Sequence, residues 1–294
     1  MGVDSSMTGR ASPNLVAVGD NCLDVYLNKD LLTVGGNALN VAVQWRRNGW
    51  SVRYFGAVGD DPEGEITLRE VETAGLFRDD VEMIPGDTAV TLLRDQSGDR
   101  TFLFESFGVG ENYMPAPHNW GVVSKADWVH LGTNANKDLV RRLVREHVPF
   151  SVDVSTAHLA LPLQGVPLVF ASGPDEPSVP VEPVMAALRS AGARQVVLTC
   201  GSRGAYFCDS QGVRHAEASP TAVVDTCGAG DSFIATFITA FCFAGLDADG
   251  AMRKASFYAS RTCTHLGGFP QEPRPIPDWL PLKYADVINR ETRV

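Results

Sequence analysis

The chain has 294 residues, of which 44% are hydrophobic and 20% are charged, and it carries a formal net charge of −10. A chain of this composition can fill a packed core, which argues against global disorder. Its acidic balance and the lack of any Lys/Arg run argue against a nucleic-acid-binding surface. No run of 18 apolar residues occurs, so we expect no membrane span.

The six cysteines are scattered along the chain, and none forms a C-x-x-C pair. Single cysteines in a chain of this length are typical of a reducing compartment, so the sequence predicts a cytoplasmic protein. Residues 1–13 are polar and lack an apolar stretch. We expect them to form a disordered tail before a single domain over residues 14–294.

Short β-rich runs alternate with helical patterns over most of the chain. Strands are predicted at Leu15–Val18, Arg53–Val58, Trp128–Leu131, Ser151–Val154, Leu168–Ala171 and Gln195–Thr199, and helices at Ala38–Asn48, Glu63–Ala74, Lys137–Glu146 and Glu182–Ala191. This alternation predicts an α/β domain whose mainly parallel sheet is covered by helices on both faces.

One region departs from that alternation. Thr88–Arg94 and Arg100–Glu105 read as a β-hairpin with a Gly-containing turn, and Leu23–Leu27 and Leu31–Val34 could join the same small sheet. We expect these strands, within residues 21–35 and 86–107, to form a small β lid over the substrate. The alternative is an ordinary hairpin excursion. Further on, five prolines in Phe269–Pro281 predict an extended tail over the surface, followed by a weak helical region.

The strongest functional signal is the segment Asp225-Thr226-Cys227-Gly228-Ala229-Gly230-Asp231, which precedes a helix with an apolar stripe. The first N–H groups of a helix have no partner in the helix, and glycines let them approach an anion closely. The segment therefore predicts a phosphate site. Asp231 would compete with a bound anion, so we expect it to accept a proton from an attacking hydroxyl; the alternative is a simple helix N-cap.

Two motifs carry a family resemblance. The segment from Asp225 to Asp231 resembles the D-T-x-G-A-G-D signature of the ribokinase-like (PfkB) sugar kinases, and Gly35–Ala42 resembles their G-G-x-x-x-N-x-A signature. The resemblance covers residues 14 to 269. It implies a ribokinase-like fold, ATP as co-substrate, Mg²⁺ as cofactor, Asp231 as catalytic base, and an anion hole built from the N–H groups of Gly228, Ala229 and Gly230.

The resemblance also assigns binding roles by position. It implies that the substrate is bound by Asp24, Gly36, Asn37 and Asn40, the nucleotide by Thr199, Gly201, Gly204, Asp225 and Thr226, and Mg²⁺ by Glu176 through water. Gly173 stands where the family's metal motif has Asn, which leaves the metal geometry open.

Three short segments favour one branch of the family. Gly19–Tyr26, Gly36–Val43 and Phe170–Pro174 resemble members that phosphorylate fructosamines, sugar-amine conjugates such as fructoselysine. The alternatives are another sugar, such as fructose or ribose, or a non-catalytic relative that binds nucleotide or sugar. We expect neither nucleic acid nor membrane as a partner. A homodimer that pairs through the lid is possible, because small open-edged sheets often pair with a copy of themselves.

Overall fold

The computed structural model describes residues 12–96 and 99–291. Its strands are β1 (Asn14–Val18), β2 (Cys22–Tyr26), β3 (Leu31–Gly35), β4 (Ser51–Gly59), β5 (Val81–Ile84), β6 (Val90–Gln96), β7 (Asp99–Ser106), β8 (Trp128–Leu131), β9 (Phe150–Asp153), β10 (Leu168–Ser172), β11 (Val196–Thr199), β12 (Ala205–Asp209), β13 (Gly212–Ala216) and β14 (Arg274–Pro275). Its helices are α1 (Asn37–Arg47), α2 (Pro62–Thr73), α3 (Trp120–Val123), α4 (Lys137–Arg145), α5 (Glu182–Ser190), α6 (Ala229–Ile238), α7 (Ala248–Thr262), α8 (Trp279–Lys283) and α9 (Ala285–Glu291).

A nine-stranded sheet forms the body of the molecule, in the order β13-β12-β11-β10-β9-β8-β1-β4-β5. The strands from β11 to β5 in this order pair in parallel, whereas β12 and β13 pair antiparallel at one edge. All six strands predicted from apolar runs lie in this sheet, and the four predicted helices correspond to α1, α2, α4 and α5. The mainly parallel α/β architecture is confirmed.

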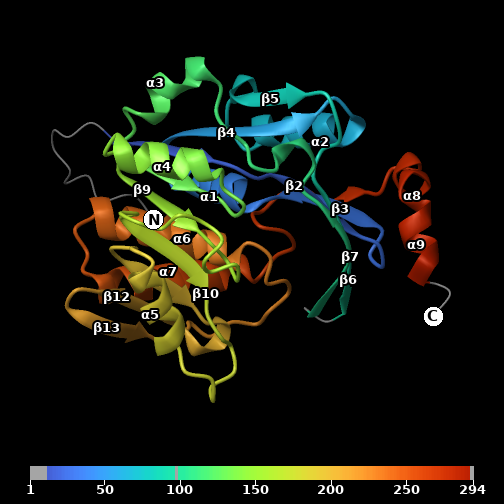
Figure 1. Cartoon of the computed structure of the whole chain (residues 1–294). Helices are drawn as coiled ribbons and strands as arrows, with labels where there is room; N and C mark the ends of the chain where they lie inside the picture. The colour runs from blue at the N-terminus through green and yellow to red at the C-terminus, as the bar shows by residue number, and fades with distance from the viewer. Residues whose placement is uncertain (1–11, 97–98, 292–294) are drawn as a thin grey trace.

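Helices cover both faces of the sheet, as Figure 1 shows. Side chains alternate along β1, so that Leu15 and Ala17 join one hydrophobic cluster with α1, α6 and α7. Val16 and Val18 point the other way and pack with α4 and α5. Burial on both faces explains why the strands read as continuous apolar runs in the sequence.

A second sheet, which we call the lid sheet, contains β14-β3-β2-β6-β7. Strands β2 and β6 pair in parallel, and the other neighbours pair antiparallel. The predicted hairpin and the two earlier strands therefore do share one small sheet. Residues 97–98 of the predicted turn, like residues 1–11 of the predicted tail, lie outside the described residues. Strand β7 forms an edge of the lid sheet, and its pairing with a second copy stays a prediction.

One expectation for the chain needs correction, and one hairpin was missed. The proline-rich segment Phe269–Pro281 is not simply an extended tail, because its residues 274–275 pair with β3 and α8 begins at Trp279. The β12–β13 hairpin was not predicted at all. Both strands are short, and the second is mostly exposed and carries no apolar run, so the pairing has little signal in the sequence.

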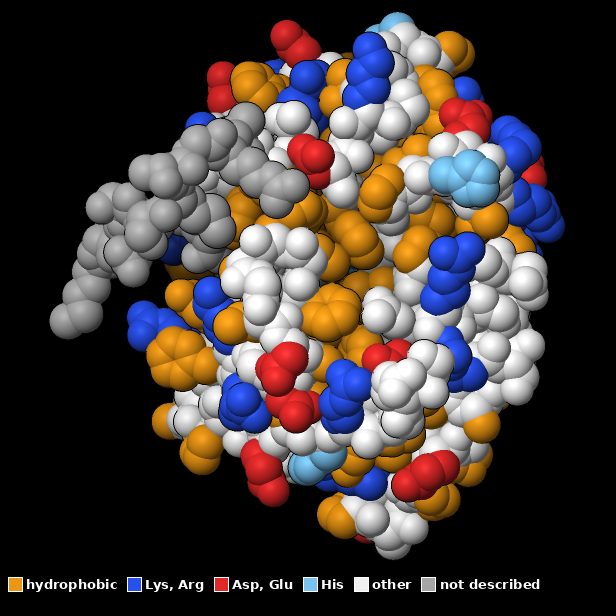
Figure 2. All heavy atoms as spheres, turned by 90° about the vertical axis from the view of Figure 1, so that its left-hand side faces the viewer, with side chains coloured by type: hydrophobic (Ala, Val, Ile, Leu, Met, Phe, Trp, Pro, Cys, Tyr) orange, Lys and Arg blue, Asp and Glu red, His pale blue; other side chains and the backbone are white. Residues whose placement is uncertain are grey.

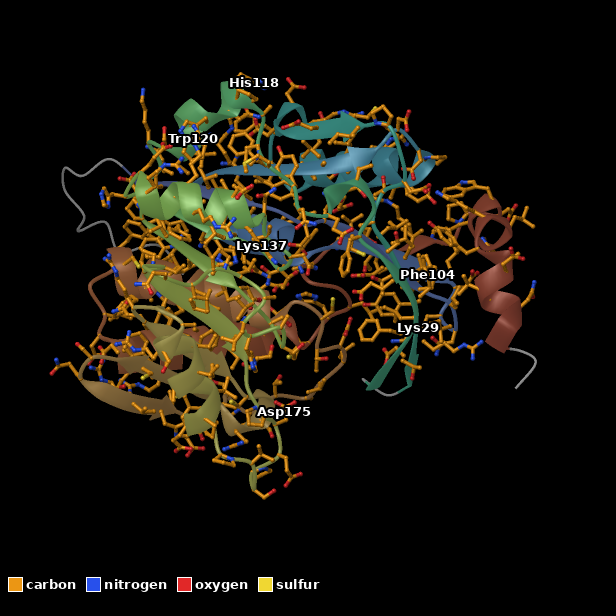
Figure 3. The ribbon with its side chains drawn as sticks, viewed as in Figure 1. Lys29, Phe104, His118, Trp120, Lys137 and Asp175 are labelled. Atoms are coloured by element: carbon orange, nitrogen blue, oxygen red, sulfur yellow. The ribbon has the colours of Figure 1, made fainter. Side chains whose placement is uncertain are left out.

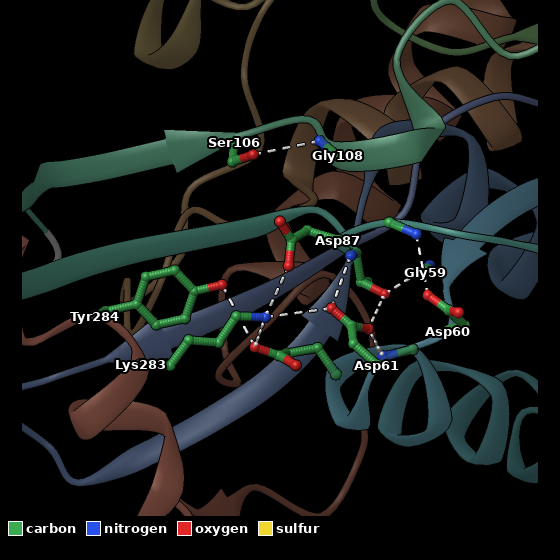
Figure 4. A network of polar contacts seen from close by, with 12 residues as sticks. Gly59, Asp60, Asp61, Asp87, Ser106, Gly108, Lys283 and Tyr284 are labelled. Carbon is green, nitrogen blue, oxygen red and sulfur yellow. Dashed lines mark hydrogen bonds and ion pairs between the residues drawn. The ribbon is translucent and has the colours of Figure 1, made fainter.

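The C-terminal segment fastens the lid sheet to the body of the molecule. The ring of Tyr284 lies 5.6 Å from that of Phe104 on β7, which is labelled in Figure 3. Lys283 Nζ lies 2.8 Å from Glu63 Oε1, 3.1 Å from Asp87 Oδ1 and 3.3 Å from Asp61 Oδ2 (Figure 4). One ammonium group therefore joins α8 to the start of α2 and to the chain that enters β6.

None of the described helices is both long and apolar enough to cross a membrane. Figure 2 shows one face of the molecule, on which acidic and basic side chains are interspersed around apolar ones.

Candidate active site

The glycine-rich segment forms the tight turn that opens α6. Gly228 has φ 70°, and a Cβ there would lie 2.3 Å from Gly268 Cα, so only glycine fits without a shift. The backbone N–H of Ala229 donates to the carbonyl of Thr226 at 3.3 Å. Among the described residues, the N–H groups of Gly228, Gly230 and Asp231 have no hydrogen-bond partner. The N–H groups left open to an anion therefore include that of Asp231, whereas the predicted N–H of Ala229 is already bonded.

Asp225 holds this turn from inside the fold. Its side chain is fully buried, and its Oδ1 accepts a hydrogen bond from the N–H of Cys227 at 2.9 Å. Its Oδ2 accepts from the hydroxyl of Tyr26 at 2.8 Å and from the N–H of Gly267 at 3.0 Å. The carboxylate, expected to contact nucleotide, instead ties the turn to β2 of the lid sheet. The neighbouring Thr226 is exposed at the surface of the turn.

Asp231 lies in the first turn of α6, and its carboxylate is held by a different helix. Asn37 Nδ2 donates to Oδ1 at 2.7 Å, and Asn40 Nδ2 donates to Oδ2 at 2.6 Å. The side chain caps no N–H of its own helix, so the N-cap alternative is not what the structure shows. Burial raises the pKa of Asp231 to about 7, with a smaller contribution from the charge of Asp153. A base of this pKa is half ionised near neutral pH.

Helix α1 presents the polar side chains that the second motif predicted. Gly36 has φ 109°, and a Cβ there would lie 2.4 Å from Asn21 Cα. The carboxylate of Asp20 accepts the N–H groups of Asn37 at 2.7 Å and Ala38 at 3.2 Å, so a residue far from the helix in sequence caps it. Asn40 Oδ1 is buried without a partner among the described residues. A sugar hydroxyl is a suitable donor to it.

These groups line a cavity of about 200 Å³ between the lid sheet and the body. Of the predicted site residues, the cavity brings together Asp24, Gly36, Asn37, Asn40, Gly228 and Asp231. Asp24 lies in β2 of the lid sheet, within the strand expected at Leu23–Leu27. The predicted nucleotide and metal residues do not line this cavity.

A row of polar side chains crosses the lid sheet. Asp24 on β2 is in register with Thr91 on β6, and Thr91 is in register with Glu105 on β7. All three line the cavity, which places them on one face of the sheet. Two strand spacings separate Asp24 from Glu105, about 10 Å. Sequence reasoning missed Thr91 and Glu105, since strand register is not visible in a single chain segment.

The predicted nucleotide segment lies at the carboxyl ends of β10 and β11. Gly173 N–H donates to the carbonyl of Thr199 at 2.9 Å, which joins the two loops. Gly201 has φ 50° and Gly204 has φ 85°, so both occupy backbone conformations that favour glycine. A Cβ on Gly201 would lie 2.7 Å from Asp175 Oδ1; Figure 3 labels Asp175 in the adjoining loop.

Arg203 organises the loop that carries Glu176. Its Nη1 donates to the carbonyls of Pro174, Glu176 and Val179, each at 2.9 Å. A Cβ on Gly173 would lie 2.5 Å from Cys200 Sγ, so the buried thiol occupies the space that any larger residue there would need.

The side chain of Glu176 is exposed. No group of three or more His, Cys, Asp or Glu side chains within residues 12–96 and 99–291 could enclose a metal ion. The exposed carboxylate of Glu176 is an oxygen donor of the kind that Mg²⁺ prefers.

The chain combines a parallel sheet, a lid sheet at the carboxyl edge of that sheet, and a glycine-rich helix start beside a half-buried carboxylate. This is the arrangement of a ribokinase-like fold. The chain has the same fold as Arabidopsis thaliana ribokinase complexed with ribose and ATP, with a TM-score of 0.76 at 20% identity over 89% of this chain and 96% of that one. It is 31% identical to fructosamine kinase FrlD of Bacillus subtilis, over 87% of this chain and 92% of the relative. It is 28% identical to fructoselysine 6-kinase of Escherichia coli, over 87% and 99%.

The pfkB family of carbohydrate kinases matches residues 12–148 and 171–274. The chain belongs to this family and is an ATP-dependent sugar kinase, as the two motifs predicted. Kinases of this family use ATP together with Mg²⁺.

Proposed function

We propose that this kinase phosphorylates a hydroxyl of a fructosamine, with Asp231 as the base. The observation that carries the proposal is the charge of the cavity. Its lining includes Asp20, Asp24, Glu105 and Asp231, and the described residues contribute no Lys, Arg or His to it. A fructosamine carries a secondary amine that is protonated at neutral pH, whereas fructose and ribose are neutral. An acidic wall therefore favours the cationic substrate.

Glu105 is the carboxylate best placed to bind the amine. Asp20 is occupied by the N-terminus of α1, and Asp231 is bound by Asn37 and Asn40. Glu105 is exposed on the lid sheet and forms no hydrogen bond or ion pair with the other described residues. Its distance from Asp24 matches a substrate whose hydroxyls bind Asp24 while its amine reaches the outer strand. The likeness to FrlD and to fructoselysine 6-kinase supports the same substrate class.

The chain's own residues then account for the reaction. Asp24 and Asn40 orient the sugar, because a carboxylate and an amide oxygen together accept several hydroxyl hydrogen bonds. Asp231 accepts the proton of the attacking hydroxyl. The N–H groups of Gly228 and Gly230 stabilise the negative charge of the moving phosphoryl group. ATP with Mg²⁺ supplies that group when bound. Exposed Glu176 and exposed Thr226 are proposed to face the metal and the nucleotide.

The experiment compares kinetics on a fructosamine and on fructose. Glu105→Gln removes one charge with little change in shape, so KM for fructoselysine should rise about tenfold while the constants for fructose stay unchanged. Glu111→Gln, at an exposed position just after the lid strands, is the matched control. Equal effects on both sugars would exclude Glu105 as the amine ligand. Turnover of neutral sugars with no turnover of fructosamines would refute the substrate class.

A further inference from the structure

A chain of buried and half-buried polar side chains runs behind the proposed base. His130 on β8 is fully buried, with the rings of Trp45 and Phe170 against it at 6.4 and 6.2 Å. Its Nδ1 lies 2.9 Å from Ser151 Oγ, and its Nε2 lies 3.2 Å from Asn37 Oδ1. Burial lowers the pKa of His130 to about 3, so the imidazole is neutral and carries one N–H.

Donor chemistry fixes the direction of this chain. The indole Nε1 of Trp128 donates to Ser151 Oγ at 3.0 Å, and an indole N–H can only donate. If Nδ1 of His130 carried the proton, its bare Nε2 would face the amide oxygen of Asn37. If the amide were flipped, that oxygen would face two carboxylates. Every contact pairs a donor with an acceptor only when the Ser151 hydroxyl donates to Nδ1 and Nε2–H donates to Asn37 Oδ1.

Asn37 therefore directs its NH₂ group at two carboxylates. Its Nδ2 lies 2.7 Å from Asp231 Oδ1 and 2.8 Å from Asp153 Oδ2. The second oxygen of Asp153 accepts the N–H of Ser155 at 2.8 Å. Because one nitrogen contacts both carboxylates, the distance between Asp231 Oδ1 and Asp153 Oδ2 cannot exceed the sum of these two contact distances. Their protonation is therefore coupled.

The groups that face Asp231 carry one sign of charge. Asp153 at the end of β9 and Asp20 in the loop after β1 both raise the pKa of Asp231, and α1 contributes only the neutral Asn37 and Asn40. Asp24 and Glu105 of the lid sheet lie across the same cavity. Asp153 shares the donor Asn37 with the base, and no reaction step of the proposed function uses Asp153.

We propose that Asp153, together with the chain Trp128–Ser151–His130–Asn37, is a positioning relay that sets the direction and the proton occupancy of Asp231 during phosphoryl transfer. The proposal rests on the base role given to Asp231 in the proposed function. Asn37 orients the base, His130 and Ser151 orient Asn37, and Asp153 opposes its ionisation.

The two ends of the relay should shift the pH profile of kcat/KM in opposite directions. Asp153→Asn removes the like charge, so the acidic limb should move to lower pH by about one unit. His130→Phe keeps a ring between Trp45 and Phe170 but frees the amide of Asn37, so the limb should move to higher pH and kcat should fall several-fold. Ser151→Ala should behave like His130→Phe, whereas Ser151→Thr, which keeps the hydroxyl, should retain the wild-type profile.

A spectroscopic titration separates this proposal from the proposed function. Carboxyl ¹³C signals of labelled aspartate report the ionisation of Asp231 and Asp153 without any turnover. The titration midpoint assigned to Asp231 should fall in Asp153→Asn, even if no fructosamine is a substrate. Folded variants whose midpoints and pH profiles both match the wild type would overturn the relay. Loss of activity with an unchanged profile would reduce Asp153 to a structural role.

Discussion

The carboxylate of Asp231 should cost the protein stability at the pH where it works, and Asp231→Asn tests this. The pKa of Asp231 is raised from 3.8 to about 7 on folding, so the folded state holds its proton more tightly than the unfolded chain. The stability that the bound proton contributes is fully present below the pKa of Asp231 in the unfolded chain. It is lost as the pH rises through the folded-state pKa of about 7. An asparagine cannot ionise, so the variant should not lose stability over this range.

The magnitude follows from the same pKa difference. At about 1.4 kcal/mol for each pKa unit, the full shift corresponds to about 4 kcal/mol. Because Asp231 is only partly shielded from solvent, we expect about half of this, and between pH 5 and 8 about 1–2 kcal/mol. In Asp231→Asn, the new NH₂ group also replaces an oxygen that accepts from the NH₂ group of Asn37 or Asn40. The lost hydrogen bond costs about 1 kcal/mol at every pH. The quantity to measure is therefore how the difference in free energy of unfolding between Asp231→Asn and wild type changes with pH. The size of that difference at a single pH does not test the argument.

Urea denaturation followed by tryptophan fluorescence at several pH values between 5 and 8 measures this quantity. The stability of Asp231→Asn relative to wild type should rise steadily with pH, while kcat falls by two or more orders of magnitude. Asp278→Asn, which removes an exposed carboxylate without a capping hydrogen bond, shows what the loss of one surface charge does by itself. If the free energies of unfolding of Asp231→Asn and wild type changed with pH in parallel, the reasoning would be refuted.

Two further substitutions test the turn and the C-terminal connection. Gly228→Ala should cost at least about 1–2 kcal/mol, because Ala resists the left-handed conformation and its Cβ would overlap Gly268. Gly230→Ala has open space and should leave Tm unchanged or slightly higher, and equal Tm losses would contradict the assigned geometry. Lys283→Met should cost about 2 kcal/mol and lower Tm by about 4–8 °C, because fully buried Glu63 loses its cation. An unchanged Tm in calorimetry would show that this ion pair does not fasten α8.

The sequence specified the features that depend on consecutive residues. Apolar runs bounded by turns predicted the central strands, because a strand buried on both faces needs no polar alternation. The glycine-rich segment before a helix predicted an anion site, because the left-handed conformation of Gly228 and the free N–H groups of α6 are local properties of the backbone. The same segment placed Asp231 beside that site.

Only the tertiary structure showed what surrounds those features. Glu105 joins Asp24 in one row because of strand register, which depends on pairing between distant segments. Asp225 proved to be buried under Tyr26, a contact between residues 199 positions apart. His130 reads in the sequence as one residue of an apolar strand, and its link to Asp231 through Asn37 exists only because β8, α1 and α6 meet at the carboxyl edge of the sheet. Local backbone chemistry encoded the turn with open N–H groups at the start of α6, whereas long-range packing decided the charge, the shape and the protonation of the pocket.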